Sequence, residues 1–326
     1  MKAIVVTAFG GPEFMAYRDL EIPQVQSGQV LIRVEKTSVN FADIKSRYGK
    51  KGASLPFIPG LDAAGVIEQV GADVTHLKAG QRVIAFPSKG TYAEYVVADA
   101  NLTFALPDSI DFETAAACPV VSFTSFKLLA DVARLEPGET VLIHAAAGGI
   151  GTTAIQLAKL LGAGSVIGTV GHSKKVDAAL NAGADHVISL DQEDFADKVN
   201  RLTEGKGANV ILDSIAGSIS ERSLLCLAPY GRLVHFGNSS GEMGHFKTQD
   251  LHASCRSVLG FSFGTTRVQR PHLLQNTADR VLNYISKGQL KMNIGKQFAL
   301  KDAAQAHEWV ESRQSTGKVL MNVRQQ

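Results

Sequence analysis

The sequence predicts an α/β protein with two parts, a β-rich domain and a domain built on a doubly wound parallel sheet. Three observations support this prediction. The first hundred residues or so alternate short apolar runs with turns that contain glycine and proline. From Thr140 onward, apolar strands alternate with helical stretches, and a glycine-rich turn separates the first of these strands from its helix. Alternation of strand and helix is typical of βαβ units and a parallel sheet.

Length and composition agree with a water-soluble protein of two domains. The chain has 326 residues, of which 45% are apolar and 20% charged, and chains of this length usually divide into two cores. No run approaches the roughly 18 apolar residues that a membrane helix needs. The opening MKAIVVTAFGG is expected to form a strand and a turn and not a secretion signal.

Charge and cysteine content exclude two further classes. The 33 basic residues are balanced by 31 acidic ones, so no broad basic surface for nucleic acid is predicted. The three cysteines are odd in number and far apart, which argues against a disulfide scaffold and for a reducing compartment. We therefore expect a cytoplasmic protein that binds neither nucleic acid nor membrane.

The N-terminal part is predicted to be mostly strand. Val30, Ile32 and Val34 alternate with Leu31, Arg33 and Glu35, which is the period of a half-buried strand. Other strand-like pieces here are Ala64–Val70, Arg82–Phe86 and Tyr92–Val97. Near residue 110 the composition becomes helical, and we expect helices over Asp111–Ala117 and Pro119–Ala130.

The following part is predicted to form the parallel sheet. Its expected strands are 141–145, 165–170, 186–190, 209–213 and 232–237. After about residue 258 the pattern loosens, and the chain is expected to end with a helix over Asp302–Arg313 and a strand over Lys318–Val323.

A glycine-rich turn lies between the first of these strands and an amphipathic helix. The segment Ala146-x-Gly148-x-x-Gly151 is a variant of the dinucleotide-binding pattern GxGxxG, with alanine at its first position. Gly148 would let the backbone approach a pyrophosphate, and Gly151 would let helix and strand pack closely. The free N–H groups and the dipole of the helix would attract the phosphates. This context predicts a nucleotide-binding Rossmann domain in preference to a purely structural turn.

The residues after the second strand indicate which nicotinamide cofactor binds. An NAD-binding domain usually places an acidic residue there, on the ribose hydroxyls. This chain has Gly171-His172-Ser173-Lys174-Lys175 and no acid before Asp177. Two lysines and a serine suit a 2′-phosphate, whereas an acid would repel it. We therefore predict NADPH, with NADH as the alternative.

Seven stretches, spread from one end of the chain to the other, match a known family: VNFADIKSRYG (39–49), PFIPGLDAAGVI (56–67), KAGQRV (78–83), AAAGGIGTTAIQLAKLLGA (145–163), GTVGHSKK (168–175), FGNSSG (236–241) and ESRQSTGKVL (311–320). In these stretches the chain resembles the medium-chain dehydrogenase/reductase superfamily, most closely its NADPH:quinone oxidoreductase branch, which includes zeta-crystallin-like proteins. The resemblance implies a GroES-like catalytic domain formed by residues 1–119 and 259–326, a Rossmann domain formed by residues 120–258, a cofactor site between them, and a homodimer.

The resemblance also implies individual site residues. Asn40 would lie beside the nicotinamide, Thr124 near the nicotinamide ribose and Lys175 on the 2′-phosphate, while Asn238 and Arg313 would contact the cofactor. Together with the turn, the predicted cofactor-binding residues are Asn40, Thr124, Gly148, Gly149, Ile150, Gly151, Ser173, Lys174, Lys175, Asn238 and Arg313. Two positions depart from the family pattern: Leu190 replaces an aromatic residue that faces the adenine, and Lys45 replaces a tyrosine near the substrate.

The chain lacks the zinc ligands of alcohol dehydrogenases in the same superfamily. Ser38–Phe41 contains no cysteine, and Leu61 and Asp62 stand where a His-Glu pair would lie. Because catalytic zinc needs three converging protein ligands, no metal site is predicted. His252-x-x-Cys255 offers only two ligands.

Without a Lewis acid, an acceptor with a conjugated, easily reduced system is expected: a quinone or an α,β-unsaturated carbonyl. Negative charge on the acceptor oxygen would need hydrogen-bond donors, and the predicted catalytic residues are Asn40, Arg47 and Tyr48. Each could instead have a structural role: Asn40 as a turn residue, Arg47 as a surface charge and Tyr48 as a loop anchor. Two alternative functions stay open: an enoyl-thioester reductase, and a non-catalytic NADPH-binding sensor or crystallin-like protein.

Overall fold

The structure is a computed structural model that describes residues 1–50 and 52–324. Its contacts divide the chain into two compact units. Unit 1 consists of residues 1–123 and of those from Arg267 onward, and unit 2 consists of residues 124–266. These limits differ from the expected 119/120 and 258/259. Helix α3 (Pro119–Phe126) runs through the first limit, and strand β13 (Ser257–Gly260) belongs to the sheet of unit 2.

Unit 1 is built on antiparallel strands. Its main sheet has the order β14-β15-β3-β4-β5-β7, with β6 paired to β3, and β1 pairs with β2 separately. The strands are β1 (Lys2–Val6), β2 (Met15–Asp19), β3 (Gln29–Val39), β4 (Ala63–Val70), β5 (Arg82–Ala85), β6 (Tyr95–Asp99), β7 (Thr103–Ala105), β14 (Ile294–Ala299) and β15 (Lys318–Asn322). The helices are α1 (Phe41–Arg47), α2 (Phe112–Ala117), α10 (Leu274–Ser286) and α11 (Ala303–Glu311), and α9 (Phe263–Gln269) begins in unit 2 and ends here.

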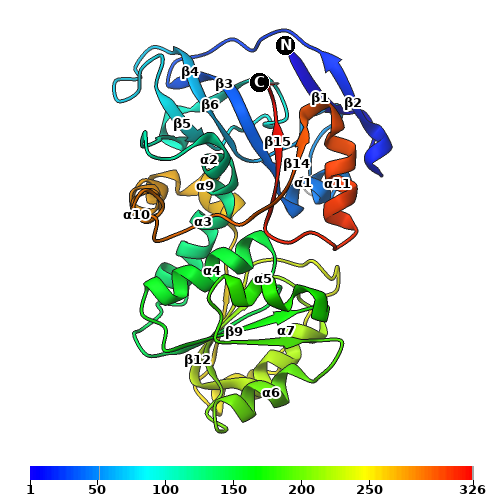
Figure 1. Ribbon diagram of the computed structural model, residues 1–326, viewed down its shortest axis with the longest axis vertical. Helices are drawn as coiled ribbons and strands as arrows, with labels where there is room; N and C mark the ends of the chain where they lie inside the picture. Colours follow the sequence, from blue (N-terminus) through cyan, green and yellow to red (C-terminus); the bar gives the residue numbers. More distant parts are fainter. Residues whose placement is uncertain (51, 325–326) are drawn as a thin grey trace. The chain divides into compact units, whose positions relative to one another are not determined.

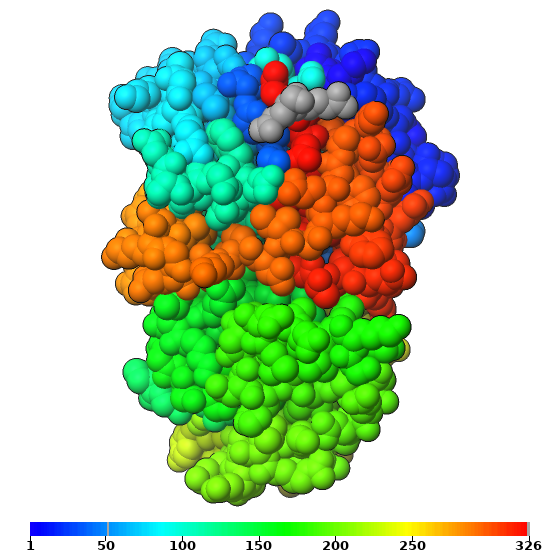
Figure 2. Space-filling model, viewed as in Figure 1, coloured from blue at the N-terminus to red at the C-terminus, as the bar shows by residue number. Residues whose placement is uncertain are grey.

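The two ends of the chain meet in this unit. β15 pairs antiparallel with β3, so that Val319 lies opposite Val39. Figure 2 shows the C-terminal residues, orange to red, directly against N-terminal residues coloured blue to cyan. On β3, Val30, Ile32 and Val34 are completely buried and Arg33 and Glu35 are half-buried, but Leu31 is buried too, so the alternation holds only from Ile32 onward. The return of the C-terminal segment therefore completes the sheet around a shared apolar core.

Unit 2 is a doubly wound parallel sheet, and the predicted fold class is confirmed. In this unit, all of whose residues the structure describes, the strand order is β10-β9-β8-β11-β12-β13, which is the Rossmann order. The strands are β8 (Thr140–Ile143), β9 (Ser165–Val170), β10 (His186–Ser189), β11 (Ala208–Asp213), β12 (Leu227–His235) and β13 (Ser257–Gly260). The helices are α4 (Gly149–Leu160), α5 (Val176–Asn181), α6 (Phe195–Leu202), α7 (Ser218–Ser223) and α8 (Thr248–His252).

Alternate side chains of these strands face opposite layers of helix. Leu142, Ile167 and Ile211 pack with Phe195 and Val199 of α6, while α4 and α5 lie on the other side of the sheet (Figure 1). Strands buried on both faces need near-continuous apolar sequence. This is why the five strands expected in this unit could be recognised from the sequence. β13 was not expected, because its SVLG segment is short and only half-buried.

The expected helix over Pro119–Ala130 is also modified. α3 is followed by a wider helical turn over Lys127–Val132. In the part of the chain that is described, no helix combines the length and apolar character required to cross a membrane.

Candidate functional site

Three of the predicted cofactor-binding segments of unit 2 lie at one edge of its sheet. The glycine turn follows β8, Ser173–Lys175 follows β9, and Asn238 follows β12. Parallel strands end at the same edge, and the strand order reverses between β8 and β11. Ligands of open α/β sheets bind outside the carboxyl ends of the strands at such a switch point.

The two glycines of the turn have different surroundings: Gly151 is closely packed, and Gly148 has open space beside it. A Cβ on Gly151 would lie 2.5 Å from the carbonyl oxygen of Ala145 and 2.6 Å from the backbone of Ala146, so only glycine fits. A Cβ on Gly148 would meet only the Ala145 oxygen, at 3.4 Å, which leaves the outer side of Gly148 clear. Thr152 donates its N–H to the Gly148 carbonyl, and the amides of Gly149, Ile150 and Gly151 precede it in the first turn, where amides lack partners within the helix. A pyrophosphate fits against these amides.

Ser173, Lys174 and Lys175 form a short 3-10 turn after β9. The His172 ring accepts the Lys174 N–H at 3.2 Å and therefore fixes the start of this turn. Asp191 lies beside it: its Oδ2 is 3.7 Å from His172 Nδ1. The Ser189 hydroxyl hydrogen bond lowers the pKa of Asp191, so the segment contains one carboxylate among the cationic side chains.

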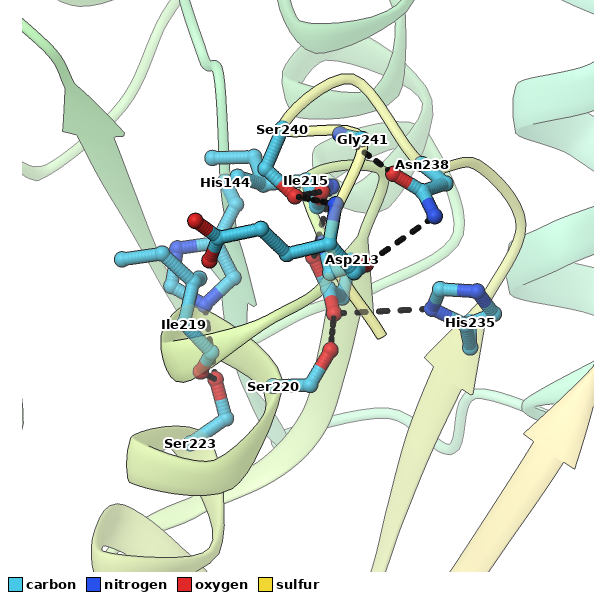
Figure 3. Close-up of polar contacts among 12 residues, drawn as sticks. His144, Asp213, Ile215, Ile219, Ser220, Ser223, His235, Asn238, Ser240 and Gly241 are labelled. Atoms are coloured by element: carbon cyan, nitrogen blue, oxygen red, sulfur yellow. Dashed lines mark hydrogen bonds and ion pairs between the residues drawn. The ribbon is translucent and has the colours of Figure 1, made fainter. Parts of the chain in front are cut away.

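The loop that contains Asn238 is tied to the loop after β11. Asn238 Nδ2 donates to the Glu242 carbonyl at 3.0 Å, and its Oδ1 accepts the Gly241 N–H at 2.6 Å. Ser240 Oγ donates to the Ile215 carbonyl at 2.7 Å (Figure 3). These contacts hold the Asn238 side chain in a fixed place at the carboxyl edge of the sheet.

Asp213 anchors this second loop. Its Oδ1 accepts the N–H groups of Ile215 and Ala216 at 2.8 and 3.2 Å, its Oδ2 accepts the Ser220 hydroxyl, and His235 Nδ1 lies 3.6 Å away (Figure 3). The carboxylate is completely buried, so these donors replace the water it has lost.

A buried histidine lies behind the same loops. His144 is held between the hydroxyls of Thr169 and Ser223, each at 2.9 Å. Burial lowers its pKa to about 4, so the ring is neutral near pH 7. Its ring edge contacts Phe195, and it joins β8 to β9 and α7 as part of the core.

Thr124 supplies a hydroxyl that the protein itself leaves unused. The side chain is 4% exposed, and within the described chain its Oγ1 has no hydrogen-bond partner. Buried hydroxyls are rarely left unpaired. A bound dinucleotide would offer a hydrogen-bond partner to this hydroxyl and would fill the space on the open side of Gly148.

In unit 1, Asn40 is the centre of a buried polar cluster. Asn40 Nδ2 donates to Asp62 Oδ1 at 3.0 Å, and Asn40 Oδ1 accepts from Lys318 Nζ at 2.8 Å. Asp62 also accepts the Ser38 hydroxyl at 2.7 Å and the Val120 N–H at 3.1 Å. We name Asn40, Asp62 and Lys318 the Asn40 cluster; each of its members is less than a tenth exposed.

A second buried chain of hydrogen bonds supports helix α1. Asp43 Oδ2 accepts the Asn40 N–H at 2.8 Å and the Tyr92 hydroxyl at 3.1 Å. The other Tyr92 partner is His307 Nε2 at 3.0 Å, and His307 Nδ1 lies 3.4 Å from Arg47 Nη1. Because a guanidinium only donates, Nδ1 is the acceptor and Nε2 carries the proton. Burial and the Arg47 charge lower the pKa of His307 to about 3, which keeps this ring neutral.

Arg47 is placed differently from its predicted role. Its side chain is completely buried: Nε donates to the Gly10 carbonyl at 3.0 Å, and Nη2 binds Glu311 at 2.7 Å. All three nitrogens of the guanidinium are therefore engaged within unit 1, and the possibility that Arg47 is a surface charge is wrong. Tyr48 is 44% exposed and lies over the Arg47 guanidinium. Arg313 is exposed and follows α11 in a left-handed conformation.

Among residues 1–50 and 52–324, no group of three or more His, Cys, Asp or Glu side chains is arranged to hold a metal ion. Asp62 stands at a position expected for the His-Glu pair. Its carboxylate accepts hydrogen bonds from Asn40, Ser38 and Val120. Leu190, at the end of β10, packs on the α6 side of the core.

Sequence reasoning missed most of the buried support. Lys318 was expected only as the start of a strand, and Asp43, Tyr92 and His307 received no specific role. One available signal was polarity inside apolar segments: Asp62 and Lys318 each stand next to residues that are otherwise strand-like. The pairing of these residues depends on the return of β15 to β3 and has no local signature.

Comparison with known proteins places the chain in a family. Residues 26–108 match the model of the alcohol dehydrogenase GroES-like domain, and residues 149–281 match that of the zinc-binding dehydrogenase. The chain is 39% identical to a quinone oxidoreductase of Pseudomonas aeruginosa, over 98% of this chain and 99% of that one. The crystal structure of Escherichia coli quinone oxidoreductase complexed with NADPH matches with a TM-score of 0.93 and 34% identity, over 99% of this chain and 100% of that one. A quinone oxidoreductase structure from Pseudomonas syringae matches with a TM-score of 0.92 and 36% identity, over 98% and 99% of the two chains.

Proposed function

Since the chain belongs to the medium-chain dehydrogenase/reductase superfamily, within its quinone oxidoreductase branch, we propose that it reduces a quinone or the C=C bond of an α,β-unsaturated carbonyl without a metal. It is an NADPH-dependent oxidoreductase. The observation that best supports the proposal is the carboxyl edge of the unit 2 sheet. There the open side of Gly148, the first-turn amides of α4 and the lysine-containing turn after β9 fit a phosphorylated dinucleotide.

Each part of this edge has an assigned task. The amides of Gly149, Ile150 and Gly151 bind the pyrophosphate, where the helix dipole favours negative charge. Ser173, Lys174 and Lys175 bind the 2′-phosphate, and the Thr124 hydroxyl binds the nicotinamide ribose. Asn238 and Arg313 are further cofactor contacts. The bound cofactor supplies a hydride.

The acceptor side of the reaction is assigned to unit 1. Asn40 orients the nicotinamide and the acceptor, and its carboxamide N–H is a donor for negative charge that develops on the acceptor oxygen. Tyr48 is exposed enough to contact an acceptor. Arg47 supports the helix and is no longer proposed to donate to the acceptor, because its nitrogens are engaged by Gly10, Glu311 and His307. A proton from solvent completes the reduction.

Reduction of a conjugated acceptor asks little of the protein beyond placement. Holding two reactants in contact supplies a large share of the rate without any Lewis acid. Asn40 and Asp62 belong to the segments in which the resemblance would put the zinc ligands of related enzymes. Together with Lys318 they offer a carboxamide, a carboxylate and an ammonium, a donor set that suits hydrogen bonding better than zinc. We therefore propose a zinc-independent reaction.

An acceptor panel tests the proposal. NADPH oxidation is followed with 1,4-benzoquinone, 9,10-phenanthrenequinone, a 2-alkenal and crotonyl-CoA, each with NADH as control and each repeated after dialysis against a chelator. We expect turnover with a quinone or the alkenal, faster with NADPH, and unchanged by the chelator. Turnover with crotonyl-CoA alone would favour an enoyl-thioester reductase. Binding of NADPH without oxidation by any acceptor would favour a sensor or crystallin-like protein.

We also propose that the chain acts as a cytoplasmic homodimer formed through unit 2. Strand β13 supports this, because it is the last strand on one side of the sheet and its residues are partly exposed. An edge strand with open backbone groups can pair with a second copy.

A further inference from the structure

The Asn40 cluster contains a buried ammonium whose role the proposed function does not explain. Lys318 begins β15 and is 4% exposed. Its Nζ donates to the Asn40 side chain at 2.8 Å and to the Val39 carbonyl at 3.1 Å. Among the described residues, no carboxylate oxygen lies within 4 Å of this nitrogen. A buried charge is costly and is normally paired, yet both hydrogen bonds of Lys318 go to neutral oxygens.

These contacts determine the orientation of the Asn40 carboxamide. An asparagine amide can usually be turned over without a clear penalty, because its oxygen and nitrogen are similar in size. Here Lys318 can only donate and the Asp62 carboxylate can only accept. The oxygen must therefore face Lys318 and the nitrogen must face Asp62, as the structure has them. A reversed amide would face donor to donor and acceptor to acceptor.

Asp62 is itself held rigidly. The Ser38 hydroxyl occupies Oδ1 at 2.7 Å, and the Val120 N–H occupies Oδ2 at 3.1 Å. Asp62 is completely buried and Asn40 is only 7% exposed. The Asn40 oxygen also faces the Asp43 N–H in a capping box at the start of α1. After these contacts the carboxamide retains one N–H, which has a fixed direction.

We propose that Lys318 and Asp62 are positioning residues that hold the Asn40 carboxamide in one orientation, so that its remaining N–H meets the nicotinamide and the acceptor in a fixed place. This inference rests on the proposed function, because Asn40 is assigned there to the cofactor and the acceptor. Lys318 and Asp62 act through Asn40 and contact neither reactant.

The test compares Lys318→Met and Asp62→Asn with a matched control. Lys318→Met keeps the length of the side chain and removes its charge and donors. Lys36→Met is the control, because Lys36 is also a largely buried lysine in this sheet, but its ammonium binds Glu113, Gln297 and Asn322 and not Asn40. Each variant is measured for single-turnover hydride transfer to a quinone, with ordinary and 4-deuterated NADPH. Binding is measured for NADPH and for 2′-phospho-ADP-ribose, which is NADPH without its nicotinamide ring and is called ATP-ribose below.

We expect Lys318→Met and Asp62→Asn to slow hydride transfer by about 100-fold, the loss typical of reactants displaced by about an ångström. Binding of ATP-ribose should not change, and Lys36→Met should match the wild type in every measurement. Wild-type hydride transfer in Lys318→Met would overturn the inference. An equal loss of affinity for NADPH and ATP-ribose would also overturn it, because a general structural defect would not distinguish the nicotinamide from the rest of the cofactor.

Failure of the proposed function gives a different result. If the wild type transfers no hydride to any acceptor, the proposed function is wrong. The ratio of NADPH affinity to ATP-ribose affinity then tests the positioning alone, since it needs no turnover. A ratio that falls in Lys318→Met but not in Lys36→Met supports the inference, and an unchanged ratio contradicts it.

The pH profile of the wild type tests the inference even if Lys318→Met and Asp62→Asn fail to fold. Burial lowers the pKa of Lys318 below the ordinary lysine value of 10.5, while Asp62, Asp43 and Cys118 partly oppose this shift. Hydride transfer should therefore fall reversibly with rising pH as Lys318 loses its proton and releases Asn40. Lys318→Arg, which keeps its charge, should move this fall to higher pH. A rate that stays level through the pH range of lysine ionisation would overturn the inference.

Discussion

Lys175 is the residue to which the choice of cofactor is assigned. It ends the short turn after β9, beside Lys174 and Ser173. A charge-assisted hydrogen bond contributes about 1.5–3 kcal/mol. Lys175→Ala should therefore weaken NADPH binding by about ten- to hundredfold and leave NADH binding nearly unchanged.

Fluorescence titration with both cofactors measures this effect. Lys206→Ala is a suitable control, because Lys206 is a highly exposed lysine of the same unit, and its ammonium lies 3.7 Å from Glu204. An equal loss of NADH and NADPH affinity in Lys175→Ala would show that the side chain supports the turn and does not select the phosphate.

The glycine turn is the element with the clearest division between stability and binding. A Cβ at position 151 would lie 2.5–2.6 Å from backbone atoms of Ala145 and Ala146 in the turn after β8, whereas a Cβ at position 148 would meet one atom at 3.4 Å. Gly151→Ala should lower the free energy of unfolding by about 1–3 kcal/mol, the usual cost of overpacking. Gly148→Ala should fold with nearly wild-type stability but bind NADPH more weakly.

Urea unfolding and NADPH titration of both variants separate the two effects. Gly148 has an extended backbone that alanine adopts freely, so its own conformation adds no strain. Comparable stability losses in the two variants would mean that the space beside Gly148 is not kept open for a ligand.

Helix α1 contains a buried acid whose ionisation should affect stability. Burial raises the pKa of Asp43 from 3.8 to about 7, although the Asn40 N–H and the Tyr92 hydroxyl partly oppose this. A carboxyl with a raised pKa in the folded state contributes stability that is complete below pH 3.8 and is lost as the pH rises to 7. Asp43→Asn has no such loss. Its stability relative to the wild type should therefore increase by up to about 4 kcal/mol between pH 4 and pH 8.

Unfolding free energies of both proteins at several pH values measure this difference. His144 and His307, whose pKa values burial lowers to about 4 and about 3, give the opposite slope between those values and 6.5, but they are present in both proteins and cancel. Parallel stability curves for wild type and Asp43→Asn would show that Asp43 stays ionised when the protein is folded.

Elements with local signatures were readable from the sequence, and elements that depend on distant pairing were not. A window of about twenty residues is enough to recognise the glycine turn at Gly148 and Gly151 and every strand of unit 2 except β13. The same holds for the cluster of lysines after β9. The contact between Asn40 and Lys318 joins residues 278 positions apart in the chain. β13 was missed for a similar reason, because its three half-buried residues and one exposed residue become a strand only through pairing with β12.

Arg47 illustrates the same limit for a site residue. The resemblance suggested it as a donor to the acceptor, and no helix was predicted at this position. Its burial depends on Glu311 and His307 of α11, more than 250 positions later. The surroundings of this side chain therefore had no signal in the neighbouring sequence.

For the whole molecule, the proposed homodimer predicts a mass in solution twice that of the chain. Light scattering on the purified protein, with and without NADPH, measures it directly. A single-chain mass at all concentrations would contradict assembly through unit 2, and β13 would then remain an open edge of the sheet.

The most direct measurement is NADPH oxidation by 9,10-phenanthrenequinone, made on chelator-treated wild type and on Asn40→Ala side by side. We expect the wild type to turn over and to prefer NADPH to NADH. Asn40→Ala should lose at least about 100-fold in kcat, as enzymes do when a donor to the reacting oxygen is removed, and still bind ATP-ribose. Wild-type protein that binds NADPH but oxidises it with no acceptor, or an Asn40→Ala variant as active as the wild type, would contradict the proposed function and its assigned site.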